Sequence, residues 1–378
     1  MKNQRERFLS LDVFRGMTIC FMIIVNTPGS GAFAFSPLRH AAWHGFTPTD
    51  LVFPSFLFAV GNAMSFSLDK YRQISNAAFL TKVLKRAALI FLIGYLMYWF
   101  PFFRIDAAGH IAAAPISYTR VLGVLQRIAL CYLFASLMIH YLSTRAAVFT
   151  STALLIGYWV LLLLFGDHAQ PFSLLGNAGL HLDKFLMGDN HLYHGEGVPF
   201  DPEGWLGTVP AIVNVFIGYM AGRFIQQKGK GYETISRLML TGALLIFLAI
   251  WWNMVFPINK KLWTSPFVLL TTGIDLLLIS ALIYIVEIKN LNTANWTRFF
   301  VIFGKNPLFI YLLSEILVTI LNMIHIASGA SLFDWINDIL FQVVAPGAVG
   351  SFLFALCYML LCWSVGWWLN KRKIYIKL

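Results

Sequence analysis

Long apolar segments alternate with short polar connections along the whole chain. The apolar runs lie at about 10–27, 49–68, 83–103, 118–142, 147–165, 205–226, 234–256, 264–287, 297–322 and 345–369. A helix of roughly 20 apolar residues is long enough to cross a bilayer. The pattern therefore predicts an all-α, polytopic membrane protein with about ten transmembrane helices, forming one domain over residues 1–378.

Two of the connections, at about 27–48 and 166–204, are long and rich in Gly, Pro, His and Asp. Long loops of this kind often carry function. The basic residues concentrate in alternate short connections and at the two ends of the chain, for example at Lys2, Arg5, Arg7, Lys371 and Arg372. Because cytoplasmic segments carry an excess of Lys and Arg, both termini are predicted to be cytoplasmic and both long loops to face outward.

Composition supports the membrane assignment. Charged residues make up only 12% of the chain and hydrophobic residues 58%, whereas a soluble domain is about 25% charged. The net charge of +11 is scattered in short clusters, which fits loops facing anionic lipid and argues against a nucleic-acid partner. The four cysteines lie in apolar runs without a C-x-x-C pair, so neither a disulfide framework nor a zinc site is indicated.

The N-terminal charges and the apolar run after them also resemble a signal peptide. Asp12 and Arg15 interrupt that run, which favours a permanent first helix. The two are three residues apart on one helix face. They either pair with each other and anchor the inner end of the helix, or have a role in function. Asn26 lies at the outer end of the same helix, before Pro28.

The stretch "LRHAAWHGFTPTD" places two histidines and an acid at the mouth of the second helix. Thr47 as N-cap and Asp50 three residues later form a capping box, with Pro48 at the first helical position. A capping box does not explain His40, which is suited to proton transfer near neutral pH and whose tautomer a nearby carboxylate would fix. A metal site at His40 and His44 is the alternative, but no recognised ligand spacing is present, so no metal is predicted.

Further polar groups lie where the sequence predicts membrane or outer loop. Asp201 and Glu203 precede the sixth apolar run, where they either bind a hydroxyl-rich or cationic acceptor or belong to a solvated turn. Arg120 and Arg127 are seven residues apart, about 10 Å along one helix face. They suit phosphates, or Arg127 forms a buried ion pair with Asp275 or Glu315.

Several of these blocks occur together and in order in one known family. The stretches "SLDVFRGMTICFMIIVNTPG", "LRHAAWHGFTPTDLVFPSFLFAVG", "RVLGVLQRIALCY", "DPEGWLGTVPAIVNVFIGYMAG", "INKKLWTSPFVLLTTG" and "GKNPLFIYLLSEIL" resemble heparan-α-glucosaminide N-acetyltransferase and its bacterial relatives. The resemblance covers essentially the whole chain and corresponds to the membrane core of that family. It implies a transmembrane acyltransferase domain that moves acetyl from cytoplasmic acetyl-CoA to the amine of a glucosamine-type sugar outside.

The resemblance also assigns residues. The family's active histidine falls on His40 and its helix-end asparagine on Asn26, while His44 stands where the family has Asn. The resulting expectation for the site is as follows: catalytic His40, Asn26 and Asp50; acetyl-CoA held by Arg15, Arg120, Arg127, Lys305 and Asn306; acceptor held by Trp43, His44, Asp201, Glu203 and Asn259.

Two mechanisms and two other functions stay open from sequence. His40 is either a general base for direct transfer or the acceptor of the acetyl group in a ping-pong reaction. The other functions are an amino-sugar or N-acetylglucosamine transporter, although no internal repeat is present, and an O-acyltransferase acting on a glycan or lipid. The expected location is a bacterial inner membrane. A GxxxG motif at Gly218 and Gly222 either supports a homodimer or only packs helices within the chain.

Overall fold

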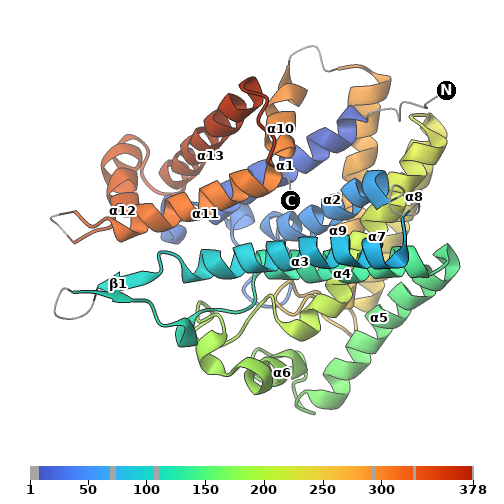
Figure 1. Ribbon diagram of the computed structural model, residues 1–378, viewed down its shortest axis with the longest axis horizontal. Helices are drawn as coiled ribbons and strands as arrows, with labels where there is room; N and C mark the ends of the chain where they lie inside the picture. The colour runs from blue at the N-terminus through green and yellow to red at the C-terminus, as the bar shows by residue number, and fades with distance from the viewer. Residues whose placement is uncertain (1–7, 69–73, 106–109, 292–294, 327–328, 377–378) are drawn as a thin grey trace.

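The computed structural model describes residues 8–68, 74–105, 110–291, 295–326 and 329–376. Figure 1 shows a bundle of long helices with a short hairpin at one end. The basic cluster Lys2, Arg5 and Arg7 lies outside the described residues. The long helices are α1 (Leu9–Asn26), α2 (Val52–Ser67), α3 (Asn76–Trp99), α4 (Val124–Tyr141), α5 (Thr144–Phe165), α7 (Trp205–Lys228), α8 (Tyr232–Trp252), α9 (Ser265–Leu282, continued as a π-helix η7, Ile283–Ile288), α11 (Pro307–Met323) and α13 (Ala348–Lys371).

Shorter elements connect the long helices. They are the 3₁₀ turns η1 (Gly31–Phe33), η2 (Ser36–Leu38), η3 (Pro48–Leu51), η5 (Ile116–Tyr118) and η6 (Asp189–His191), the helices α6 (Ala178–Met187), α10 (Trp296–Lys305) and α12 (Leu332–Ile336), and the π-helix η8 (Asn337–Gln342). A two-stranded antiparallel hairpin, β1 (Phe103–Ile105) with β2 (Ile111–Ala113), follows α3. The all-α prediction therefore misses one small hairpin, which begins after Pro101, a residue that cannot continue a helix.

Every predicted apolar run is helical, but fewer than ten helices meet the requirements for a span. Within the described ranges, seven helices are long and apolar enough to cross a membrane, or eight if the bent pair α10–α11 counts as one. Helix α2 is short, with 16 residues, and α3 carries Lys82, Lys85 and Arg86 in its first half. The predicted continuous run at 297–322 is instead two helices that meet at 82°, because Pro307 follows the break at Asn306.

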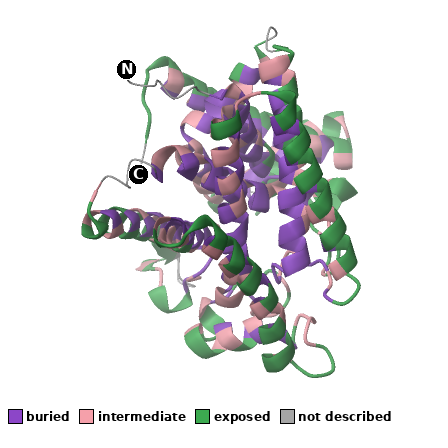
Figure 2. Ribbon diagram, turned by 90° about the vertical axis from the view of Figure 1, so that its right-hand side faces the viewer, coloured by how far each residue is buried: buried purple, intermediate pink, exposed green. Residues whose placement is uncertain are grey.

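Helix α7 lies at the centre of the bundle. Buried residues make up 72% of its most apolar window, against 22% for α5 and 28% for α8, which lie at the rim with exposed apolar faces suited to lipid (Figure 2). Its closest neighbour is α2. A Cβ at Gly218 would lie 2.1 Å from the backbone oxygen of Phe58, so the GxxxG glycines allow close approach between two helices of the same chain.

The two long connections form ordered loops. Residues 27–48 contain η1 and η2, and residues 166–204 contain α6 and η6. The first of these loops packs on the connection between α8 and α9, where Gly45 donates its N–H to the carbonyl of Ile258 at 2.8 Å. Gly45 has φ = +112°, a conformation that favours glycine. The contact joins a loop near the beginning of the chain to the connection between α8 and α9.

Candidate functional site

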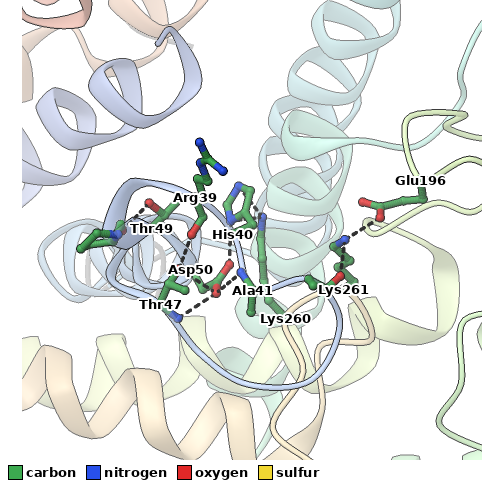
Figure 3. A network of polar contacts seen from close by, with 11 residues as sticks. Arg39, His40, Ala41, Thr47, Thr49, Asp50, Glu196, Lys260 and Lys261 are labelled. Carbon is green, nitrogen blue, oxygen red and sulfur yellow. Dashed lines mark hydrogen bonds and ion pairs between the residues drawn. The ribbon is translucent and has the colours of Figure 1, made fainter. Parts of the chain in front are cut away.

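Asp50 is the buried anion around which the first long loop folds. The predicted capping box is present, because Thr47 and Asp50 each accept the other's backbone N–H. The same carboxylate accepts the N–H of Ala41 at 3.2 Å, and its Oδ1 lies 2.6 Å from Nδ1 of His40 (Figure 3). The two readings of Asp50, helix cap and partner of the histidine, are therefore both correct.

The charge state of Asp50 fixes the orientation of the His40 ring. Burial alone would raise the pKa of Asp50, but the hydrogen bond and charge of His40 and the N–H groups of Thr47 and Ala41 outweigh it, so that this pKa lies below its usual value. An ionised carboxylate only accepts hydrogen bonds, so Nδ1 of His40 carries the hydrogen. Nε2 is then left with a lone pair, and the side chain is 41% exposed while that of Asp50 is 1% exposed. The imidazole of His40 is therefore an accessible base that is hydrogen-bonded to the buried carboxylate of Asp50.

Lys260 is the third member of this group, which we call the His40 site: His40, Asp50 and Lys260. Its Nζ lies 3.2 Å from Nε2 and 3.4 Å from Nδ1 of His40. An atom almost equidistant from both ring nitrogens lies over the ring and off the axis of the Nε2 lone pair. The lone pair therefore stays open to a substrate, with the amine beside it.

The connection between α8 and α9 positions Lys260. Asn259 accepts the N–H of Leu262 at 2.8 Å through its side chain and donates its own N–H to Thr264. Trp263 is fully buried with a left-handed φ of 57°, which is strained for a bulky residue. Its indole donates to Asn214 of α7 at 3.0 Å. These contacts make the turn rigid, so Lys260 is held in place over His40.

Trp43 and His44, predicted to bind the acceptor, line the same loop. Trp43 donates to the carbonyl of Phe172 at 2.8 Å and packs on Phe200, 5.5 Å between ring centroids. It therefore joins the two long loops. His44 is exposed and lies 3.3 Å from the amide of Asn259, and burial lowers its pKa. Asn259, the third predicted acceptor residue, is itself fully buried and holds the turn.

Arg120, Asp201 and Glu203 form a second group, which we call the Arg120 cluster. The guanidinium binds Asp201 through two hydrogen bonds, at 2.9 and 2.6 Å, and Glu203 at 2.5 Å. Tyr98 and Tyr193 cover its faces at 4.9 and 4.8 Å. The structure thus brings Arg120, predicted to hold acetyl-CoA, together with Asp201 and Glu203, predicted to hold the acceptor. Two carboxylates therefore already surround the charge of Arg120.

The Arg120 cluster and the His40 site influence each other electrostatically. Burial lowers the pKa of Lys260, while the charges of Glu203 and Asp50 oppose that decrease. Burial would raise the pKa of Glu203, but the charges of Arg120, Arg127 and Lys260 lower it overall. Glu203 is therefore an anion close enough to act on Lys260, although no direct hydrogen bond joins the two within the part of the chain that the structure describes.

Arg127 lies beneath the loop that carries Lys260. It is fully buried, donates to the carbonyl of Gly204 at 3.1 Å and stacks on Trp263 at 4.8 Å. The alternative ion pair with Asp275 or Glu315 is wrong, because Ser55 donates to Asp275 at 2.5 Å and Asn26 donates to Glu315 at 3.4 Å. Among the described residues, Nε and Nη1 of Arg127 have no partner.

The other predicted cofactor ligands lie at the opposite end of α1 from the His40 site. Arg15 pairs with Asp12 at 2.9 Å, as the sequence suggested, and donates to the carbonyl of Gly304 at 3.0 Å. Lys305 donates to Asn370 at 2.7 Å. Asn306 binds the backbone of Ile374 and Ile376 at 3.0 and 2.8 Å. These groups hold the helix break and the C-terminal segment together.

Asn26 lies at the C-terminal end of α1 and is exposed. Its side-chain amide donates to Glu315 of α11. Within the described residues, no hydrogen bond joins Asn26 to His40, the other residue that the resemblance marks as catalytic. Sequence reasoning missed Lys260 as a site residue. The neighbouring Lys261 lies outside the His40 site, because it donates to Glu196 and to the carbonyl of Ala42. The available signal was a pair of adjacent lysines in a predicted outer loop, where basic residues are few.

Comparison with known proteins identifies the family of this chain. Residues 7–250, which include His40, Asp50 and the Arg120 cluster, match the family described as "Heparan-alpha-glucosaminide N-acetyltransferase, catalytic". The chain belongs to this family. It is 27% identical to the human heparan-alpha-glucosaminide N-acetyltransferase over 82% of its length, and 26% identical to the mouse protein over 84%. The chain spans about half the length of these relatives, 53% and 54% respectively. Lys260 lies beyond the matched residues 7–250.

Proposed function

We propose that this protein is a transmembrane N-acetyltransferase that moves acetyl from acetyl-CoA to the amine of a glucosamine-type sugar. The single observation that carries the proposal is the 2.6 Å contact between Nδ1 of His40 and the buried carboxylate of Asp50, in a member of an N-acetyltransferase family. A histidine held in this way has one nitrogen fixed and the other available for proton transfer.

In the proposed reaction, Nε2 of His40 removes a proton from the sugar nitrogen as that nitrogen attacks the thioester carbonyl. Asp50 stabilises the imidazolium that forms, without itself taking up the proton, because its pKa is depressed. The second route, transfer of acetyl to Nε2 before the sugar, uses the same open lone pair. Direct transfer, in which Nε2 only accepts a proton, is the version we favour.

The distribution of cations supports a donor that extends along the membrane. Arg15 and Lys305 lie where α1 begins and α13 ends, together with the neutral Asn306, whereas Arg120 and Arg127 lie near the His40 site. Helix α1 is about 27 Å long, from its 18 residues. Acetyl-CoA, with phosphates at one end and the thioester at the end of a flexible arm, fits such an arrangement. Arg15 and Lys305 are then the groups that bind the phosphates.

The acceptor is proposed to approach His40 between the two long loops. Trp43 and His44 border this approach on one side, and Glu203 supplies a negative charge suited to a sugar ammonium group on the other. An aromatic ring and a carboxylate are the groups that an amino sugar would use. Heparan-type glycan ends and smaller amino sugars both contain the required amine.

Radiolabelled acetyl-CoA and the purified protein test the proposal. Glucosamine is expected to receive the label, while glucose, which offers hydroxyl groups alone, is not. Label on glucose would support the O-acyltransferase alternative. Accumulation of labelled N-acetylglucosamine in proteoliposomes without acetyl-CoA, together with no acetyl transfer, would support the transporter alternative and overturn the proposal.

A further inference from the structure

Amine acetylation involves two protons, of which His40 can carry one at a time. A sugar ammonium group has three hydrogens and the product amide has one, so two protons leave the nitrogen for each acetyl group transferred. One of them ends on the sulfur of the leaving thiolate, and the other is released. His40 accepts one proton at a time at Nε2, because Nδ1 stays protonated on Asp50.

Lys260 is placed to carry the other proton. Its Nζ is 3.2 Å from Nε2 of His40, within reach of a group bound at that nitrogen. The side chain is half-buried beneath the loops, and burial lowers its pKa, which increases the neutral fraction that a proton acceptor needs. The charged groups that act on it from neighbouring elements are Asp50 from η3, Glu203 before α7, Arg127 of α4 and Lys261 of its own loop.

The position of Nζ over the imidazole ring couples the two bases. A protonated Lys260 repels an imidazolium below it at this distance, so protonation of one group disfavours protonation of the other. The ionised Asp50 stabilises one positive charge in the pair. His40 and Lys260 together therefore carry one extra proton more easily than two. The first proton leaves before the second one binds.

Resting on the proposed function, we propose that Lys260 is a second catalytic proton carrier of the acetyl transfer. Neutral Lys260 takes a proton from the sugar ammonium and releases it to water before the next step. The freed amine attacks the carbonyl carbon, forming the C–N bond, and gives its second proton to Nε2 of His40. The C–S bond breaks with its electron pair on sulfur, and the imidazolium protonates the sulfur.

The test compares variants that separate charge from proton transfer. Lys260→Arg keeps the positive charge but cannot lose its proton, and Lys260→Ala loses both. Both are expected to lower kcat by about 100-fold or more, the usual contribution of a general acid or base. Lys261→Arg is the matched control, since Lys261 pairs with Glu196 and does not contact His40. Its rate is expected to stay within about threefold of wild type, because a structural ion pair keeps its charge.

A rescue experiment protects the test from misfolding. Lys260→Cys alkylated with 2-bromoethylamine regains a titratable amine of nearly the same length, and is expected to recover at least a tenth of the wild-type rate, with the alkylated wild type as reference. Full activity of Lys260→Arg, or no recovery after alkylation, would overturn the role of Lys260 while leaving the proposed function intact. Absence of label transfer by the wild type itself would instead overturn the proposed function, and the role of Lys260 with it.

Discussion

At the scale of single residues, the site depends on a charge that is buried but fully hydrogen-bonded. Asp50 accepts from three backbone or hydroxyl donors besides His40. Replacement by Asn keeps the shape but removes the charge that holds the hydrogen on Nδ1 and stabilises the imidazolium. Asp50→Asn is expected to reduce acetyl transfer by about 100-fold or more, measured as kcat with label from acetyl-CoA. An unchanged rate would show that Asp50 is only a helix cap.

The depressed pKa of Asp50 also predicts how stability depends on pH. The folded state favours the ionised form, so the stabilising contribution is present above the pKa of the unfolded chain, about 3.9, and is lost as the pH falls through the lower folded value. Thermal unfolding of the detergent-solubilised protein is expected to show this loss in acid. Asp50→Asn removes this contribution, so the stability difference from wild type is expected to shrink as the pH falls below about 4.

Arg120 offers a test of the contribution of a buried ion pair to stability. Its side chain is 15% exposed, and it binds Asp201 at two atoms. Removing one partner of a buried pair leaves an uncompensated charge, which lowers the free energy of unfolding by about 3–5 kcal/mol. Arg120→Ala is expected to lower the melting temperature strongly. Arg104→Ala, on the exposed strand β1, is the control, and an equal effect of both would contradict the assignment.

Residues close in sequence were predictable, and residues brought together by the fold were not. The capping box and the partnership of Asp50 with His40 lie within eleven residues of chain, so residue type and spacing indicated them. Lys260 is 220 positions from His40, and Arg120 is 81 positions from Asp201. No local pattern marks such contacts, and the sequence therefore assigned Arg120 and Asp201 to different ligands.

At the scale of the helices, close packing is encoded by glycines. Gly218→Ala would place a methyl group 2.1 Å from the carbonyl oxygen of Phe58 on α2, and overpacking of this kind usually reduces stability by about 1–3 kcal/mol. Gly157→Ala, in α5, meets nothing within 4 Å and is expected to leave the melting temperature unchanged or slightly higher. Equal effects would show that the glycines of α7 do not hold the two helices together.

Helix boundaries show why fewer helices than apolar runs meet the requirements for a span. Ten apolar runs were visible, and each became helical, but hydropathy over 297–322 does not reveal the 82° bend between α10 and α11. Pro307 was the available signal, since its ring cannot continue the helix before it. The length of α2, 16 residues, likewise depends on where η3 ends and α2 begins.

At the scale of the whole molecule, the charge distribution predicts which end faces which side. A cysteine-free variant with Gly197→Cys, in the long loop before α7, is expected to react with an impermeant maleimide from outside. A second variant with Gly229→Cys, in the loop after α7, is expected to react only after the membrane is opened. The reverse pattern would place the His40 site on the inner side and contradict transfer across the membrane.

The central claim is that acetyl crosses from one side to the other at His40. Proteoliposomes with acetyl-CoA enclosed, and an impermeant glucosamine-containing oligosaccharide outside, measure this directly. We expect N-acetylated sugar to accumulate outside with the wild-type protein and not with a folded His40→Ala variant. Equal product with that variant, or product only when both substrates share one side, would contradict the account.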